Sequence, residues 1–259
     1  MEQCLKDLRE RFTKIDIEVS PPMVPFRETV ASSDCINDSL WKDGLDESKG
    51  EGLSPTGSIQ VLTSNGHFKI ATKAFPLEKS LTDLIIGSKS AIRSVSFDSN
   101  SPNYSDSVVH QLLDQLKKYL IQPEQILAFG PKKSGPNILI VSESVRHQLC
   151  NEFREFLNSI LSGFQLAVEH GPLCGEPMMG VGFIVDSLEK INWPEDPESN
   201  CALSNVIRGQ LISTSKDAFH RSFMHLSPRL MLAMYSSDIQ TTAEVIGRVY
   251  SVVSRRLGT

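Results

Sequence analysis

Residues 137–169, NILIVSESVRHQLCNEFREFLNSILSGFQLAVE, place a short apolar run directly before a long helical pattern. The run 137–142 is typical of a buried strand, because its apolar residues are nearly continuous. The segment 145–169 predicts one amphipathic helix, since apolar residues recur three and four positions apart along it. These residues are Leu149, Phe153, Phe156, Leu157, Ile160, Leu161 and Phe164. Gly171 and Pro172 follow, and they indicate where the helix ends.

Strands and helices alternate on both sides of this stretch. Residues 58–63 and 67–74 predict a hairpin, because Asn65-Gly66 between them is the strongest short hairpin signal. Strand 125–129 is expected to join strand 137–142 through a Gly-Pro loop. The other expected elements are helices at 77–92, 106–121, 205–225 and 241–254 and strands at 179–185 and 229–235. This mixture predicts an α+β fold.

Both ends of the sequence carry elements that cannot bury their own apolar faces. Residues 2–12 predict a helix and 15–19 a strand, and the sequence closes with strand 229–235 and helix 241–254. Because such pairs make no closed core, we expect both ends to belong to domains that continue beyond this sequence. Residues 31–56 are acidic and poor in apolar residues, which predicts a flexible linker, with an acidic docking segment as the alternative.

The composition limits the possible classes of function. With 259 residues, of which 40% are apolar, the chain can bury a substantial core. A formal net charge of −5 and a pI near 5.7 argue against nucleic-acid binding by bulk positive charge. Residues 205–259 nevertheless have a local excess of Lys and Arg over Asp and Glu. That excess fits either contact with RNA phosphates or an ordinary helix end, where Arg255 and Arg256 complement the dipole at the C-terminus of helix 241–254.

Cysteine and histidine spacing gives no metal or disulfide framework. The five cysteines form no C-x-x-C pair, and the histidines show no H-E-x-x-H spacing. His170 and Cys174 would meet around a turn, but two ligands do not make a zinc site. We therefore expect no metal site and a reducing, cytoplasmic compartment. No run of about 18 apolar residues predicts a membrane span.

Two motifs resemble catalytic ones without the context that those motifs require. Residues 130–137, GPKKSGPN, have the glycines and lysines of a phosphate loop. A P-loop, however, needs G-K-[ST] directly before a helix, and here a strand follows. Residues 213–216 match S-x-x-K, but the companion K-T-G element is absent. The sequence therefore predicts no catalytic and no cofactor-binding residue in this chain.

Several blocks, in one order along the chain, resemble the elongation factor 2 family. CLKDL at 4–8 and FRETV at 26–30 are similar to the end of its third domain. The blocks similar to its fourth domain are 129–131, 135–139, 163–165, 171–178 and 180–181, and those similar to the start of its fifth are 228–231, 235 and 246–250. The order of the blocks is that of the family, and they span nearly the whole chain outside the acidic linker.

The resemblance implies a division of the chain into four segments. It implies a ribosomal protein S5 domain 2-like fourth domain, flanked by partial ferredoxin-like domains. The expected segments are the end of the third domain at 1–30, the acidic flexible linker at 31–56, the fourth domain at 57–227 and the truncated start of the fifth domain at 228–259.

One departure from the family pattern bears on function. Elongation factor 2 carries, at the tip of its fourth domain, a histidine that becomes diphthamide, followed by Arg and a glycine run before a Gln. The matching stretch here, 205–211 (NVIRGQL), has no histidine. The stretch from 208–212 to 228–231 is closer to the elongation-factor-like GTPases of large-subunit maturation. A translocating elongation factor 2 stays the alternative.

What the resemblance implies is the ribosome-binding portion of a cytoplasmic GTPase that matures the 60S subunit. Relatives of this kind work with an SBDS-type maturation factor to release anti-association initiation factor 6. GTP and Mg would be bound by a domain absent from this sequence, and no membrane or DNA partner is expected. The expected contacts with the ribosome and rRNA are Lys132, Lys133, Arg208, Gln210, Arg255 and Arg256.

Overall fold

The computed structural model describes residues 6, 25–31, 57–94, 114, 116–117, 121–151, 153–194, 197–233, 239–242 and 244–255. The expected helix 2–12, strand 15–19 and linker 31–56 lie almost entirely outside these residues. Within the expected helix 106–121, the helical positions that are described are 114, 116 and 117.

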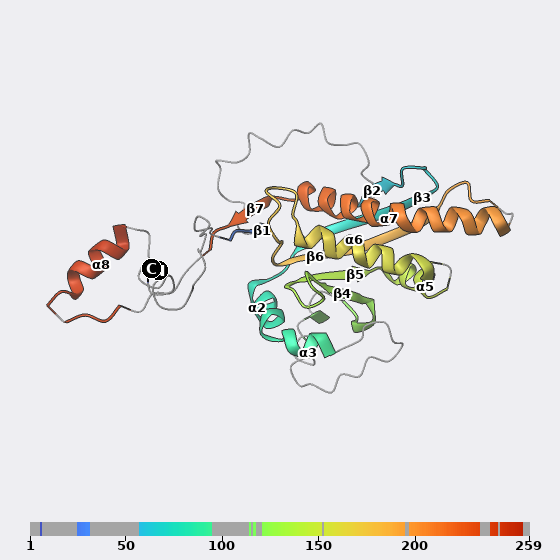
Figure 1. Ribbon diagram of the computed structural model, residues 1–259. Helices are drawn as coiled ribbons and strands as arrows, with labels where there is room; N and C mark the ends of the chain where they lie inside the picture. The colour runs from blue at the N-terminus through green and yellow to red at the C-terminus, as the bar shows by residue number, and fades with distance from the viewer. Residues whose placement is uncertain are drawn as a thin grey trace.

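Five strands form one mixed sheet in the order β2-β3-β6-β5-β4. Strands β5 and β6 run parallel, and the other neighbours are antiparallel. The expected mixture of helices and strands is confirmed (Figure 1). The strands are β2 (Ile59–Leu62), β3 (Phe68–Pro76), β4 (Ile126–Gly130), β5 (Asn137–Val141) and β6 (Val181–Lys190).

The hairpin between β2 and β3 turns where the sequence predicted. Gly66 has a φ of 73°, which a glycine adopts without strain. The side-chain oxygen of Asn65 accepts hydrogen bonds from the Thr63 hydroxyl at 2.7 Å and from the His67 N–H at 3.2 Å. These contacts fix the turn, since an Asn side chain can take the place of a backbone acceptor in a turn.

Two helices that were each predicted as one element are broken. The expected helix 77–92 divides at Ser88, whose hydroxyl donates to the Leu84 carbonyl at 2.6 Å. The expected helix 145–169 divides before Phe153, which is 2% exposed and packs on Phe68 with ring centroids 5.5 Å apart. The helices are α2 (Lys79–Gly87), α3 (Lys89–Ser94), η4 (Pro123–Gln125), α5 (Glu143–Asn151), η5 (Arg154–Phe156), α6 (Leu157–Glu169), α7 (Pro197–His225) and α8 (Ile246–Arg255).

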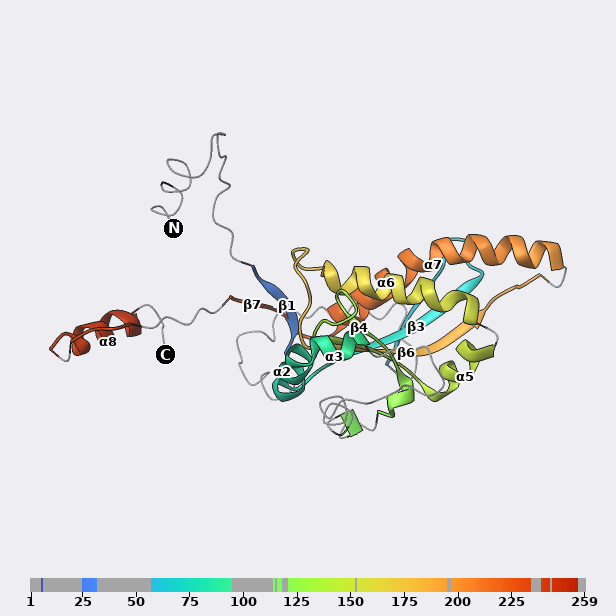
Figure 2. The ribbon, with the colours of Figure 1, turned by 60° about the horizontal axis from the view of Figure 1, so that its bottom comes forward.

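Helices α6 and α7 lie side by side over one face of the sheet (Figures 1 and 2). Phe164 of α6, Phe183 of β6 and Phe219 of α7 meet with ring centroids 5.3–6.1 Å apart. Gly163 lets the two helices approach, because a Cβ there would lie 2.7 Å from the Ile212 carbonyl oxygen. This close packing places the main core between the helices and the sheet.

A second group of buried residues lies on the opposite face of the sheet. Along β5, Leu139 and Val141 belong to the main core, while Ile138 and Ile140 pack with Leu81 and Ile85 of α2. This alternation follows the two-residue period of a strand. A strand buried on both faces explains why residues 137–141 are apolar almost without interruption.

A separate two-stranded sheet pairs β1 (Arg27–Val30) with β7 (Pro228–Met231) in antiparallel register. The sequence assigned these strands to the segments 1–30 and 228–259. They lie against each other at one end of the five-stranded sheet (Figure 1). The domain boundaries themselves stay a prediction, and the expected strand 229–235 ends at Met231.

Helix α8 forms close to where it was expected, but the prediction of its packing was wrong. The helical spacing of Ile246 and Tyr250 within 241–254 predicts an apolar face that turns inward, yet these side chains are 48% and 68% exposed. No described residue of α8 is buried. Figure 1 shows α8 beyond the β1–β7 sheet, away from the five strands. An apolar stripe predicts burial only where another element covers it.

Candidate functional site

One buried carboxylate organises the end of the molecule at which β1 lies. The side chain of Glu28 is fully buried. It accepts hydrogen bonds from the backbone N–H groups of Leu173 at 2.9 Å, Cys174 at 3.0 Å and Glu176 at 3.1 Å. Gly171 passes so close that a Cβ there would overlap the carboxylate. Because N–H donors stabilise a buried charge, Glu28 fixes the loop that carries them.

Asn137, at the start of β5, joins the segment that follows this loop to the neighbouring strands. Its Nδ2 donates to the carbonyl oxygens of Gly130 at 3.0 Å and Met178 at 2.8 Å, and its Oδ1 accepts from the Val181 N–H at 3.0 Å. The amide is fully buried and uses both of its polar atoms. We call this end the root, which comprises Glu28, Asn137 and the Gly171 loop (residues 171–176).

The lysine loop, residues 131–136, connects β4 to β5 at the root. Lys132 and Lys133 have φ values of 58° and 59°. The Ser134 N–H lies 3.4 Å from the Pro131 carbonyl oxygen, which closes a four-residue turn. Positive φ at both central positions is the pattern of a type I′ turn. The lysine loop is therefore a tight turn that leaves both lysines exposed.

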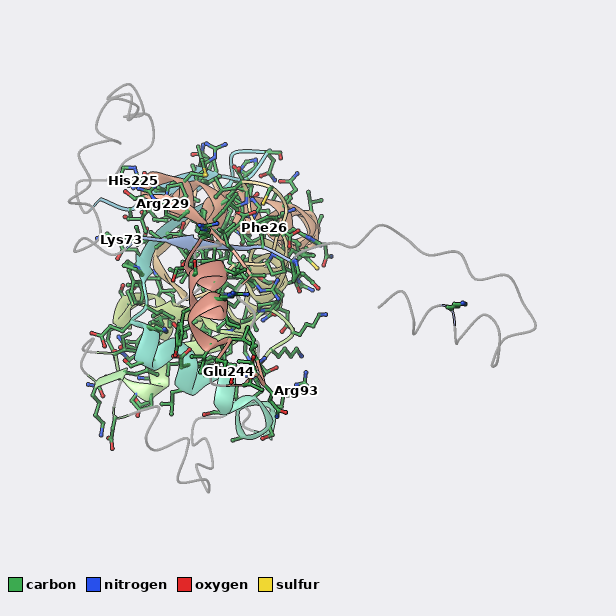
Figure 3. All side chains as sticks on the ribbon, turned by 90° about the vertical axis from the view of Figure 1, so that its left-hand side faces the viewer. Phe26, Lys73, Arg93, His225, Arg229 and Glu244 are labelled. Carbon is green, nitrogen blue, oxygen red and sulfur yellow. The ribbon has the colours of Figure 1, made fainter. Side chains whose placement is uncertain are left out.

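Helix α6 and helix α3 hold the lysine loop from two sides. Gln165 of α6 accepts from the Lys133 N–H at 3.3 Å and donates to the Phe129 carbonyl at 2.8 Å. On the other side, Nε of Arg93 donates to the buried Ser134 hydroxyl at 3.2 Å. Figure 3 shows this end of the molecule, with Phe26, Arg229 and Arg93 labelled.

Arg208 and Gln210 lie inside helix α7, where the sequence placed the tip of the domain. Arg208 pairs with Glu155 of η5 at 2.7 Å, and its side chain is 47% exposed. The Oε1 of Gln210 is buried and has no hydrogen-bond partner within the part of the chain that the structure describes. Arg208 is therefore the more accessible of the two.

The expected contact residues fall into two separated groups. Lys132 faces Glu169, the last residue of α6, while Arg208 pairs with Glu155, just before α6 begins. Helix α6 has 13 residues, so the groups are separated by about 20 Å. Arg255 lies in the last turn of α8, and Arg256 lies outside the described residues.

His220 of α7 packs against the C-terminal end of α6, and its Nε2 lies 3.2 Å from the Ala167 carbonyl oxygen. Burial lowers the pKa of His220 from its ordinary value of 6.5, against the raising effect of that hydrogen bond. The charge of Lys216 also lowers this pKa. The imidazole is therefore mainly neutral at pH 7, and protonating it opposes the fold.

Among the described residues, no three His, Cys, Asp or Glu side chains are grouped so that they could hold a metal ion. Within the same residues, no helix has the length and apolar character needed to span a membrane.

Part of the chain matches a known protein family. Residues 108–189 match the family model described as elongation factor G, domain IV. This segment contains β4, the lysine loop, β5, helices α5 and α6, and the Gly171 loop. The family resemblance drawn from the sequence is thus confirmed, by the family model for residues 108–189 and by relatives along the chain.

Relatives match the chain along its whole length. It is 33% identical to ribosome assembly protein 1 of Schizosaccharomyces pombe, over 100% of this chain and 28% of that protein. It is 30% identical to human elongation factor-like GTPase 1, over 100% of this chain and 30% of the relative. A 110 kDa U5 small nuclear ribonucleoprotein component of Arabidopsis thaliana is 30% identical to it, over 100% of this chain and 22% of the relative. The chain thus spans less than a third of the length of these relatives.

Sequence reasoning missed the two residues that organise the root. Glu28 and Asn137 lie inside blocks that carried the resemblance, yet nothing in their spacing assigned them a role. The partners of Glu28 are backbone N–H groups about 145 positions away. A pattern of side chains cannot show such a contact, because every residue except proline carries an N–H group.

Proposed function

We propose that this chain is a ribosome-binding portion of an elongation-factor-2-like GTPase that acts in late cytoplasmic maturation of the 60S subunit. The observation that carries the proposal is the similarity along the entire chain to proteins named for ribosome assembly. Two yeast proteins of that name are 33% and 32% identical to it. The similarity to human elongation factor-like GTPase 1 supports the GTPase class.

In this proposal, the five-stranded unit is the S5 domain 2-like fourth domain. Strand β1 belongs to the end of a ferredoxin-like third domain, and strand β7 belongs to the start of a ferredoxin-like fifth domain. Their antiparallel pairing supports this assignment, because the chain enters and leaves the domain at one place. The contacts of Glu28, which lies on β1, then join the third domain to the fourth domain.

GTP and Mg would be bound by a domain outside this sequence. Hydrolysis there would change the position of the fourth domain on the subunit. The contacts at the root support such a role, since Glu28 of β1 binds the Gly171 loop directly. The movement would help an SBDS-type factor to release anti-association initiation factor 6.

The candidate contacts would touch the ribosome and rRNA at separate places. Lys132 and Lys133 lie at the root, and Arg208 lies about 20 Å away beside η5. Arg255 and Arg256 belong to the segment after β7. Gln210 is the weakest of the six candidates, because its side-chain oxygen is buried.

The test is binding of the chain to purified 60S subunits, with and without the SBDS-type factor, across a salt series. We expect binding that weakens with salt, because Lys and Arg displace counterions from phosphates. Neutralising Lys132, Lys133 and Arg208 together should weaken it further. Equal binding to 60S and 40S subunits, or no binding at low salt, would contradict the proposal.

A translocating elongation factor 2 is the alternative. It requires a modifiable histidine at the tip, and residues 205–211 contain none. Diphtheria toxin and labelled NAD would label the chain if it carried that modified residue. We expect no label on this chain and strong label on elongation factor 2 in the same reaction.

A spliceosomal role is favoured by one observation, the 30% identity to the U5 component. The same binding assay with purified U5 small nuclear ribonucleoprotein tests it. Tighter binding to that particle than to 60S subunits would favour the spliceosomal role.

A further inference from the structure

The lysine loop breaks a local rule of chain geometry. A turn with positive φ at both central positions favours Asn-Gly, Asp-Gly or Gly-Gly, because larger L-residues are strained there. Here the two positions hold Lys132 and Lys133, with φ values of 58° and 59°. Asn or Gly would form the same turn with less strain.

The two lysine side chains contribute little to the fold. Lys132 Nζ lies 4.0 Å from Glu169 Oε1, and the Lys132 side chain is 75% exposed. An exposed pair at that distance adds little stability. Lys133 is anchored by its backbone N–H, which donates to Gln165. Strain that is not offset by contacts of the same residues points to a function for their side chains.

The turn is held rigidly beside a third cation. Arg93 donates through Nε to Ser134, and the other N–H groups of its exposed guanidinium have no partner among the described residues, so they can bind a ligand. Lys89 lies one turn earlier on the same short helix and is also exposed. Because the backbone of the turn is already held in place, an anion bound there would order only the side chains, which limits the loss of conformational entropy.

We propose that Lys132, Lys133 and Arg93 form a preorganised site for the phosphate groups of an RNA backbone. The choice of RNA rests on the proposed function, while the site itself rests on the strained turn. Such contacts are independent of base sequence, and they give an acidic protein a local surface that attracts phosphate.

The test separates charge from turn geometry through a Lys132→Asn/Lys133→Asn variant. Asn tolerates positive φ, so this change removes two charges and keeps the turn. The probe is a mixed-sequence RNA duplex of about 20 base pairs, titrated by fluorescence anisotropy between about 50 and 200 mM salt. We expect affinity at low salt to fall about tenfold or more and the slope of log K against log salt to fall by about two. The melting temperature should stay equal or rise.

The matched control is Lys117→Gln/Arg221→Gln. It also removes two positive charges, but from side chains that pair with Asp114 and Asp217. We expect this control to bind the duplex within about threefold of wild type. A Lys132→Asn/Lys133→Asn variant that binds like wild type would overturn the site. A control that loses as much affinity would overturn it too, because the effect would then be net charge alone.

The duplex titration and the 60S assay fail independently. Lysine-dependent duplex binding without any 60S binding would leave the phosphate site standing and remove the ribosomal role. Binding to 60S subunits together with lysine-independent duplex binding would support the ribosomal role and overturn the phosphate site.

Discussion

The root and the N-terminal half of α7 hold their residues in place by different contacts. At the root, the carboxylate of Glu28 and the amide of Asn137 are fully buried and bind backbone groups. Along α7, Ser204 and Arg208 both bind Glu155, and two of these three side chains remain partly in water. Losing a buried acceptor leaves donors unpaired, whereas water replaces a lost surface partner. The root should therefore be the rigid end, and the α7 half should tolerate change.

Replacing Glu28 should have the largest effect. Glu28→Ala leaves three N–H groups of the Gly171 loop without their acceptor, so we expect the free energy of unfolding to fall by about 3 kcal/mol or more. Urea denaturation of the whole chain measures it. Glu143→Gln, which removes an exposed carboxylate, is the control and should change stability by less than about 0.5 kcal/mol. Similar losses in the two variants would mean that the root is not special.

Gly171→Ala tests whether the Gly171 loop packs directly against the Glu28 carboxylate. The new methyl group would overlap the carboxylate, and we expect a loss of about 1–3 kcal/mol in wild type. In a Glu28→Ala background the overlap disappears, so the added cost should be much smaller. A double-mutant cycle by urea denaturation measures the coupling. Additive losses would show that the two residues do not meet.

His220, which packs between α7 and the C-terminal end of α6, should make the stability of the fold depend on pH. Its pKa is lowered in the folded chain, so the unfolded chain binds more protons near pH 6. Stability should therefore be complete above pH 6.5 and decrease as the pH falls below that value. His220→Gln should flatten this part of the profile, as thermal melts at a series of pH values would reveal. An unchanged profile would assign the effect to another histidine.

Arg208 should have the smallest effect on stability. Its pair with Glu155 is partly exposed, so Arg208→Gln should cost less than about 1 kcal/mol. The same variant is informative in the 60S assay, where a loss of binding without a loss of stability would mark a contact. A large loss of stability would instead make the α7 half as rigid as the root.

The sequence predicted the elements better than their interruptions. The Asn65-Gly66 turn and the strand at 137–141 follow from local rules that few tertiary contacts override. The break before Phe153 does not follow from local rules, because the helical spacing of apolar residues in 145–169 continues through it. The packing of Phe153 on Phe68, far away in sequence, decides that point.

Some features of the candidate site could likewise be predicted from the sequence, and others could not. The exposed lysines of the turn were visible in GPKKSGPN, since glycine, proline and lysine there indicate a loop. Their left-handed backbone was not, because Lys-Lys is an unusual choice for those positions. The distance between Lys132 and Arg208 was also hidden, because it depends on how α6 lies between them.

The position of β6 in the sheet also has a consequence during synthesis of the chain, because β6 is made long after its partner β3. Strand β3 pairs with β6 along its whole length, yet residues 77–180 separate the two in sequence. At a synthesis rate of 5–20 residues per second, β6 emerges roughly 5–20 seconds after the hairpin. Phe68 and Ile70, fully buried in the finished fold, lack that cover during the interval. We therefore expect the nascent hairpin to expose apolar surface of the kind that chaperones bind until the central strand is synthesised.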